Sequence, residues 1–339
     1  MNIYIDFDNL SSYASKGGSD SFAACNEMLR KNFNIYFTFP KTSLETCKKK
    51  VRETIMPLIK SLTRERGKST NKPEWDSAFP GHNLSKNFYE GLTSEQLMSI
   101  YWLNDENAKA MQEHGNLLFA PVGDELKSLL QLFIEGRAYP IKKYPIRKMT
   151  DWSIIGCNAS PCTDIIIIDP YLFAQSDLLY DLNAYKVISE VAKRVKGQPL
   201  NIVIFTNYKY NAESDNNSDI PITTIQRRLK EIIKEQCGAE PNITIVTMPN
   251  KEEHDRTIIT NYKVFVSGDS FKYFNDKGKN VSRGRWFDVC SLAHKENQEI
   301  VTDYLKDLQE IIKIQEEKGV KNIWGDEQSN FLNFTSKGH

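Results

Sequence analysis

Two side chains that can handle a phosphate stand two residues apart in the stretch "HDRTIITNYKVFVSGDSF", which runs from His254 to Phe271. If this segment is extended, His254 and Arg256 point to the same side of it, because side chains alternate along a strand. One face then offers an imidazole and a fixed cation. Arginine can grip a phosphate with two hydrogen bonds, and histidine can serve as a nucleophile, a base or a donor. The pair predicts a phosphate or phosphodiester site.

The residues that follow add polar groups to this predicted site. Asn261 falls in the turn of an expected hairpin, and Gly268 follows its second strand. The glycine can let backbone N–H groups approach a ligand, with Ser270 adding a hydroxyl. Arg283 and Arg285 in "SRGRW" can form a phosphate-facing rim, although such pairs are more often part of a solvated loop.

A purely structural interpretation stays open beside this one. His254 and Arg256 can simply finish a hairpin, with the guanidinium paired to Asp255, Glu253 or Asp169. A His-x-Arg pair alone favours that interpretation. The wider pattern of residues shifts the balance toward a site.

The spacing of the stretch resembles the phospholipase D superfamily motif, His-x-Lys-x4-Asp-x6-Gly-Ser/Gly-x-Asn. Aligned on His254, the lysine position falls on Arg256, the aspartate position on Asn261 and the glycine position on Gly268. Arginine keeps the charge of lysine but not its shape, and asparagine keeps the shape of aspartate but not its charge. The resemblance implies a histidine nucleophile on phosphorus, a clamp at Arg256, a positioner at Asn261 and a stabilising hydroxyl at Ser270. The differences from the motif at Arg256 and Asn261 put catalytic turnover in question more than they put the fold in question.

Residues 163–307 also resemble the phospholipase D-like C-terminal domain of MIT-domain proteins. The shared features are a strand ending in Asp-Pro-Tyr ("IIIIDPYL"), then "HDRTI", "GDSFKYF" and "SRGRWFDV". This resemblance implies a mixed sheet flanked by helices, with Asp169 and Tyr171 supporting the site. Phospholipase D enzymes bring two copies of the motif together, so one motif per chain implies a homodimer. The MIT-linked domain implies instead a dimeric, non-catalytic module that binds phospholipid surfaces.

A second candidate site lies near the start of the chain. Asp6 and Asp8 in "IYIDFDNL" end the first expected strand, where α/β sheets place their ligands. Paired carboxylates there can hold Mg²⁺, with further acids from "LNDEN" and "PVGDE". The stretch resembles the first motif of NYN/PIN-type nucleases and, equally, the Asp-x-Asp of haloacid-dehalogenase-like phosphatases. Carboxylates that end a strand are also common turn formers.

Strands alternate with helices in both halves of the chain, which predicts an α/β protein of two domains. We expect an α/β domain of uncertain type at 1–145, a linker at 146–162, a phospholipase D-like domain at 163–320 and a frayed polar tail at 321–339. The N-terminal half reads as α/β, so the helices of an MIT domain are not expected.

Composition narrows the possible partners. Lys+Arg and Asp+Glu number 44 each, so recognition of nucleic acid must be local. No apolar run approaches the roughly 20 residues of a spanning helix, and no signal peptide is recognisable. The six cysteines are few for 339 residues and predict reduced thiols in a cytoplasmic protein.

Two functions follow as hypotheses. The first is a nuclease-like phosphodiesterase whose C-terminal site needs no metal, an arrangement that suits an effector of a microbial defence system. The alternative is a non-catalytic adaptor whose C-terminal domain binds a protein partner or anionic lipid.

Overall fold

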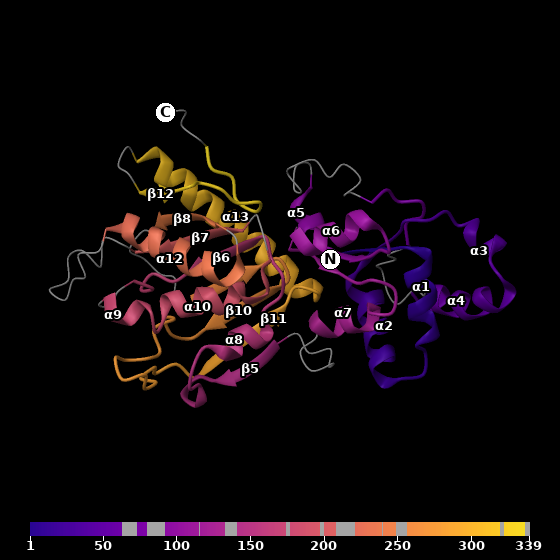
Figure 1. Ribbon diagram of the computed structural model, residues 1–339, viewed down its shortest axis with the longest axis horizontal. Coiled ribbons are helices and arrows are strands. Elements are labelled where there is room, and N and C mark those ends of the chain that lie inside the picture. Colours follow the sequence, from indigo (N-terminus) through magenta and orange to yellow (C-terminus); the bar gives the residue numbers. More distant parts are fainter. Residues whose placement is uncertain are drawn as a thin grey trace. The chain divides into compact units, whose positions relative to one another are not determined.

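The chain divides into two compact units in a computed structural model (Figure 1). Unit 1 comprises Met1–Pro140 and Ser291–Glu299, and unit 2 comprises Ile141–Cys290 and Ile300–His339. Each unit contains a sheet with helices, which confirms the predicted two-domain α/β class. The structure describes residues 1–62, 73–79, 92–114, 116–132, 141–173, 177–196, 200–207, 221–238, 240–248, 256–318 and 322–335.

Unit 1 contains a parallel sheet with the strand order β2-β1-β3-β4. Strand β1 pairs in parallel with both β2 and β3, so the order reverses direction between β1 and β3. The crevice at such a reversal is where α/β sheets bind ligands. The four residues of β1 are all buried, as expected for the centre of a parallel sheet. The strands are β1 (Asn2–Ile5), β2 (Asn34–Phe37), β3 (Ile100–Trp102) and β4 (Leu118–Phe119).

The helices of unit 1 begin at recognisable caps. The side chain of Asp6 accepts a hydrogen bond from the first turn of α1, and Ser19 does the same for α2. Tyr13 of α1 packs on Trp102 of β3, with ring centroids 5.0 Å apart. The helices are α1 (Phe7–Ser15), α2 (Asp20–Asn32), α3 (Ser43–Thr46), α4 (Lys49–Leu62), α5 (Ser94–Leu97), α6 (Glu106–His114) and α7 (Glu125–Leu132).

Unit 2 is built on a mixed eight-stranded sheet with the order β12-β8-β7-β6-β9-β10-β11-β5. Strands β6, β7 and β8 run parallel, and β9 pairs with β6 in the antiparallel direction. The apolar runs "IIII" and "IVIF" form β6 and β7 and are buried on both faces. The strands are β5 (Ile141–Pro145), β6 (Asp164–Ile168), β7 (Asn201–Thr206), β8 (Asn242–Thr247), β9 (Arg256–Thr260), β10 (Lys263–Ser267), β11 (Trp286–Ser291) and β12 (Ile323–Gly325).

Helices α8, α10 and α12 of unit 2 pack on one another in that order. Helix α12 ends at Gly238, whose φ of 69° is the left-handed conformation that glycine adopts at helix ends. None of the helices described is long and apolar enough to cross a membrane. The helical segments are η2 (Ile146–Lys148), α8 (Ser153–Asn158), α9 (Asp177–Tyr180), α10 (Ala184–Val191), η3 (Ala192–Arg194), α12 (Ile222–Cys237) and α13 (Lys295–Glu317), whose residues up to Glu299 belong to unit 1.

The segment expected to be a linker belongs to the fold of unit 2. Residues 141–145, expected in the first domain, form β5 and pair with β11. Residues 146–162 contain η2 and α8, and their Trp152 is only 1% exposed. The indole packs against Tyr273 at 4.5 Å and Phe274 at 5.4 Å between ring centroids. The charged residues around it obscured this aromatic anchor in the sequence.

The expected frayed tail is docked on the sheet instead. Strand β12 pairs with β8, and the side chains of Ser329 and Asn330 donate hydrogen bonds to the buried carboxylate of Asp164. A buried carboxylate needs such donors, and the polar tail supplies them. The tail is therefore part of unit 2 as far as residue 335.

Candidate functional site

The predicted Asp-Pro-Tyr segment and Arg256 meet at the carboxyl end of β6. Ile168, the last residue of β6, pairs with Thr257 of β9, and Arg256 is the first residue of β9. Asp169 and Tyr171 directly follow β6. Two stretches that are far apart in the sequence thus supply one group of side chains at one edge of the sheet.

Two cations lie over the same aromatic ring at this edge. The guanidinium carbon of Arg256 and the ammonium nitrogen of Lys272 are each 5.6 Å from the centroid of the Tyr171 ring. A ring face attracts cations, but the two cations repel each other. Asp169 offsets part of the charge of Arg256, and an anion that contacts both cations would offset more of it. All three side chains are half-buried, so a ligand can reach them while water screens them less than at an open surface.

Lys272 is a site residue that sequence reasoning missed. It lies in "GDSFKYF", four residues after Gly268 and outside the residues that the motif prescribes. The motif spacing alone gives no reason to select it. Its place next to Tyr171 follows from the loop that Asp169 holds.

Asp169 is a buried carboxylate that holds the backbone on both sides of this edge, and its predicted role in supporting a site stays a prediction. It is 0% exposed, and one carboxylate oxygen accepts hydrogen bonds from Ser270 Oγ and the Phe271 N–H, both at 2.8 Å. The other oxygen accepts from the Tyr171 N–H at 2.9 Å. Burial raises the pKa of Asp169, and these hydrogen bonds and the positive charge of Arg256 oppose that rise. The carboxylate thereby fixes the loop that carries Lys272.

Ser270 faces the scaffold and not the open side of the site. Its side chain is buried, and its hydroxyl donates to Asp169. The sequence placed this hydroxyl among the catalytic groups. Because its hydrogen atom is committed to a buried carboxylate, the structure assigns it to loop positioning.

Asn261, predicted as a catalytic positioner, lies at the other end of the hairpin. Its side chain is 0% exposed, and its Oδ1 accepts from the Thr163 N–H at 2.9 Å. Its Nδ2 donates to Thr163 Oγ1, also at 2.9 Å. Thr163 precedes β6, whereas Arg256 sits beside its carboxyl end, and a strand of this length spans roughly 15 Å. Asn261 therefore secures the start of β6 and cannot touch a ligand at Arg256.

Gly268 also differs from its predicted role. Its N–H donates to the carbonyl of Trp286, so it is used in the sheet and not offered to a ligand. A Cβ at this position would lie 3.8 Å from that carbonyl oxygen, an ordinary contact. The close approach occurs instead at Gly284, where a Cβ would come within 2.7 Å of Ile146.

The loop with Arg283 and Arg285 is held next to the site by Asp269. Its carboxylate accepts from Ser282 Oγ at 2.6 Å and from the Arg283 N–H at 3.1 Å. Burial disfavours ionisation of Asp269, but these hydrogen bonds outweigh it and lower its pKa. Both arginine side chains are exposed, which leaves them available as a rim. Their predicted role in phosphate binding stays a prediction.

His254, the predicted nucleophile, lies outside the described residues. In the sequence it precedes Arg256 by two residues. Its role is therefore a proposal that rests on the sequence pattern and on the position of Arg256.

The N-terminal acids Asp6 and Asp8 directly follow β1 at the start of α1, and their predicted role in holding Mg²⁺ stays a prediction. Asp6 Oδ1 accepts from the N–H and Nδ2 of Asn9, at 2.8 and 3.0 Å, and Asp6 Oδ2 accepts from the Asn104 N–H at 2.5 Å. Asp8 is exposed on α1. No group of three or more His, Cys, Asp or Glu side chains that could hold a metal occurs among the described residues. These hydrogen bonds fit Asp6 as a turn former and helix cap.

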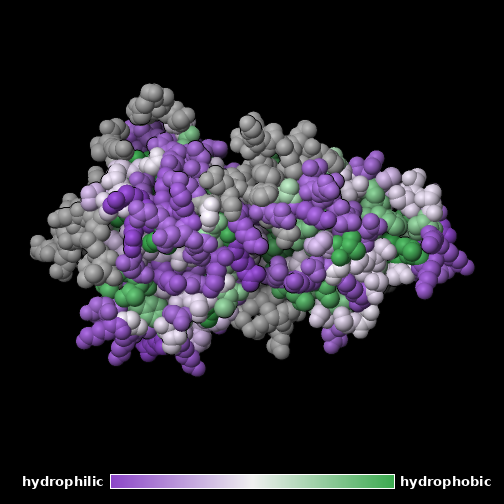
Figure 2. Space-filling model, viewed as in Figure 1, coloured by the Kyte–Doolittle hydropathy of each residue, from purple (hydrophilic) through white to green (hydrophobic). Residues whose placement is uncertain are grey.

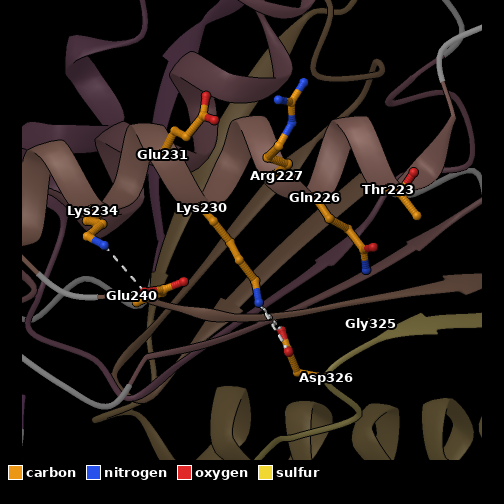
Figure 3. A pocket seen from close by; sticks show the side chains of 9 residues that line it. All are labelled: Thr223, Gln226, Arg227, Lys230, Glu231, Lys234, Glu240, Gly325 and Asp326. Atoms are coloured by element: carbon orange, nitrogen blue, oxygen red, sulfur yellow. Dashed lines mark hydrogen bonds and ion pairs between the residues drawn. The ribbon is translucent and has the colours of Figure 1, made fainter.

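A pocket of about 460 Å³ lies elsewhere on unit 2, between α12 and the end of β12 (Figure 3). Lys230 reaches across it to Asp326 at 2.8 Å, and Lys234 pairs with Glu240 at 3.4 Å. These two cations are paired with carboxylates, and none of the predicted site residues lines the pocket. Arg227 is a third cation that lines the pocket.

Comparisons with known proteins give limited likeness. No family model and no curated protein matches the chain. Among solved structures, it is similar to TrmBL2, an archaeal chromatin protein, with 13% identity and a TM-score of 0.25 over 54% of this chain and 59% of that one. It is also similar to a point mutant of yeast tyrosyl-DNA phosphodiesterase, a phospholipase D superfamily protein, with 14% identity and a TM-score of 0.20 over 38% and 25%. The chain thus spans less than two thirds of either structure.

Proposed function

We propose that unit 2 is a nuclease-like phosphodiesterase that binds a phosphodiester at the carboxyl end of β6 and cleaves it through His254. The observation that carries this proposal is the convergence of Arg256 and Lys272 on the ring of Tyr171. The chain as a whole has no net charge, so this pair of cations is a local feature and not the result of an overall positive charge.

In the proposed reaction the phosphate binds between the two cations. Arg256 grips non-bridging oxygens, and Lys272 offsets the charge that develops on them. An imidazole nitrogen of His254 attacks phosphorus, a P–N bond forms and the P–O bond to the leaving group breaks. The leaving oxygen takes up a proton, and water then hydrolyses the phosphohistidine. Asp169 is a positioning residue, since it holds the loop of Lys272 and does not face the ligand.

One motif per chain supplies one histidine, whereas this chemistry uses a nucleophile and a proton donor. Under the proposal a second copy of the chain provides the second histidine in a twofold dimer. An effector role in a microbial defence system would suit such a nuclease.

The test is hydrolysis of labelled single- and double-stranded DNA and RNA, and of bis(p-nitrophenyl) phosphate, with and without EDTA. The proposal expects cleavage that survives EDTA and is lost in His254→Ala. Cleavage that is lost with EDTA and in Asp6→Ala and Asp8→Ala would place the activity at the N-terminal acids and contradict the proposal.

A non-catalytic binding module is the second candidate. Two side chains predicted to be catalytic, Asn261 and Ser270, are used inside the fold. A domain that keeps Arg256 and Lys272 but lacks those groups can bind an anionic surface, such as a lipid or a protein partner, without turning it over. Binding that depends on Arg256, with no turnover of any substrate, would favour this candidate.

A further inference from the structure

Four exposed cations and one exposed indole form a surface beside the site. We call it the basic–aromatic surface, and it consists of Arg147, Lys148, Arg283, Arg285 and Trp286. The two cations of η2 and the two of the loop before β11 come from segments more than 130 residues apart in the sequence. In Figure 1 these segments lie along the lower part of unit 2, where Figure 2 shows mostly hydrophilic residues with a few hydrophobic ones beside them.

Direct contacts join the two segments into one surface. The N–H of Ile146 donates to the carbonyl of Arg285 at 3.2 Å. The side-chain amide of Asn280 donates to the carbonyls of Ile146 and Met149, at 2.9 and 3.0 Å. Gly284 packs so closely on Ile146 that a Cβ there would be 2.7 Å from its side chain. The cations of both segments are therefore held on neighbouring backbone.

A chain of hydrogen bonds connects this surface to the site. Asp269 binds the Arg283 N–H through one oxygen and the Ser270 N–H through the other. Ser270 in turn donates its hydroxyl to Asp169, which holds the Tyr171 backbone. The backbone of the basic–aromatic surface and the backbone of the site are therefore fixed relative to each other, and one ligand can contact both.

Nearby acids leave the surface with a positive charge. Asp269 holds the loop as an ionised carboxylate and adds one negative charge, whereas Asp288 faces Lys143 at 3.7 Å. Asp151 and Asp276 are exposed nearby in the sequence. The four cations of the surface outnumber the three acids Asp151, Asp269 and Asp276, in a chain whose total charge is zero.

Trp286 gives the surface its selectivity. It is 47% exposed at the start of β11, and among the large apolar residues exposed in the described part of the chain it is the one with an aromatic ring. An exposed indole between cations can stack on an unpaired base while the cations bind the adjacent phosphates. A duplex keeps its bases stacked inside and cannot offer them to the ring.

We infer that the ligand of this unit is single-stranded nucleic acid, whose backbone runs from the basic–aromatic surface to Arg256 and Lys272. This deepens the proposed function by naming its substrate class, and it rests on that proposal for the chemical step. The binding itself does not require turnover.

The test measures fluorescence anisotropy of a labelled 12-residue single strand, the matching duplex and anionic vesicles, with full-length protein in EDTA. His254→Ala is used as the background so that substrate is not consumed. Three variants are compared. One changes Arg147, Lys148, Arg283 and Arg285 together to Gln, and the other two are Trp286→Ala and Trp286→Phe. The control changes four exposed, ion-paired cations of α12 and α13 to Gln: Arg228, Lys234, Lys306 and Lys313.

We expect the single strand to bind at least tenfold more tightly than the duplex. The quadruple Gln variant should bind the single strand at least 100-fold more weakly than the background protein, and the control variant less than threefold more weakly. Trp286→Ala should lose about 5- to 100-fold, with most of it restored in Trp286→Phe, which keeps an aromatic ring.

Three results would overturn the inference. The first is equal affinity for the duplex and the single strand. The second is an unchanged affinity of the quadruple Gln variant for the single strand. The third is binding to vesicles without binding to the oligonucleotide. Failure of the proposed chemistry is seen separately, as the absence of EDTA-resistant cleavage by the wild-type chain. The two proposals can therefore fail independently.

Discussion

Asp169 shows how one buried side chain can organise a site that it does not enter. Its two oxygens hold the backbone of Tyr171 on one side and the loop of Ser270 and Phe271 on the other. The ring and the ammonium group that converge on the proposed ligand both depend on this carboxylate. Its ionisation should therefore be visible in the stability of unit 2.

We predict a specific pH dependence from Asp169. Its folded-state pKa is raised by burial, so the folded chain binds a proton more readily than the unfolded chain. Stability from this group is then full below the unfolded pKa of about 3.9 and declines as pH rises toward the folded pKa. Urea unfolding from pH 4 to 8 checks this, with Asp169→Asn as the reference. The unfolding free energy of the wild type should fall with pH relative to that of the variant, and an opposite slope would contradict the assignment.

Asn261 should matter for stability and not for ligand binding. Asn261→Ala leaves the buried N–H groups of Thr163 and Asp164 without their acceptor, at a cost of about 2–3 kcal/mol. Chemical denaturation measures this loss. The exposed Asn333→Ala is the matched control, with a change within about 0.5 kcal/mol. Equal effects of the two changes would show that Asn261 does not secure β6.

Sequence reasoning could find Arg256 but could not place Asn261 correctly from motif spacing. A linear motif counts residues, whereas a hairpin sends its turn to the far end of the strand from its first residue. The sequence already predicted that Asn261 lies in the turn of the hairpin. A turn residue is at the opposite end of β9 from Arg256, so the hairpin prediction itself implied that Asn261 is remote from the phosphate site. Lys272 had no such signal, because its position depends on the long-range bonds of Asp169.

Among the secondary-structure elements, β12 is the one that was hardest to predict from the sequence. It is three residues long, it lies in a polar tail, and its pairing partner β8 is about 80 residues away. Gly325 makes the docking possible. Its φ is 117°, and a Cβ there would lie 1.9 Å from the carbonyl oxygen of Ile243 and 2.4 Å from Gln226.

Gly325→Ala should therefore detach β12. We expect unit 2 to lose about 3 kcal/mol or more, because the change adds left-handed strain to a backbone clash. Hydrogen–deuterium exchange of residues 322–330 should become fast in this variant. Gly278→Ala has left-handed strain alone, with nothing within 4 Å of a Cβ, and should cost about 1 kcal/mol. Protection of β12 that survives Gly325→Ala would contradict this account.

The segment from β5 to α8 was also difficult to predict from the sequence. Strong periodic segments such as β6, β7 and α12 were predictable, since their apolar residues fix both type and burial. Residues 141–162 are short, charged elements around one buried indole, Trp152. Their structure follows from packing on distant aromatic residues, and sequence reasoning saw a linker.

At the scale of the whole molecule, charge balance makes recognition local. Lys+Arg and Asp+Glu cancel at 44 each, so binding of a single strand should depend on salt only through the phosphates at the site. With four to six phosphate contacts, log K against log salt should have a slope of about −3 to −4. Each of Arg283→Gln and Arg285→Gln should reduce its magnitude by about 0.7. A slope that these changes leave untouched would show that the phosphates bind elsewhere.

The most direct test of the site's location compares two variants in one binding assay. Affinity for a single-stranded oligonucleotide is measured for Arg256→Gln and Asn261→Ala at a temperature where both are folded. Arg256 begins β9 and Asn261 follows its last residue, Thr260, so the comparison separates the two ends of the hairpin. We predict a loss of about 10- to 100-fold for Arg256→Gln, which removes charge-assisted hydrogen bonds, and less than a twofold change for Asn261→Ala. Full affinity in Arg256→Gln, or an equal loss in both variants, would contradict a phosphate site at the carboxyl end of β6.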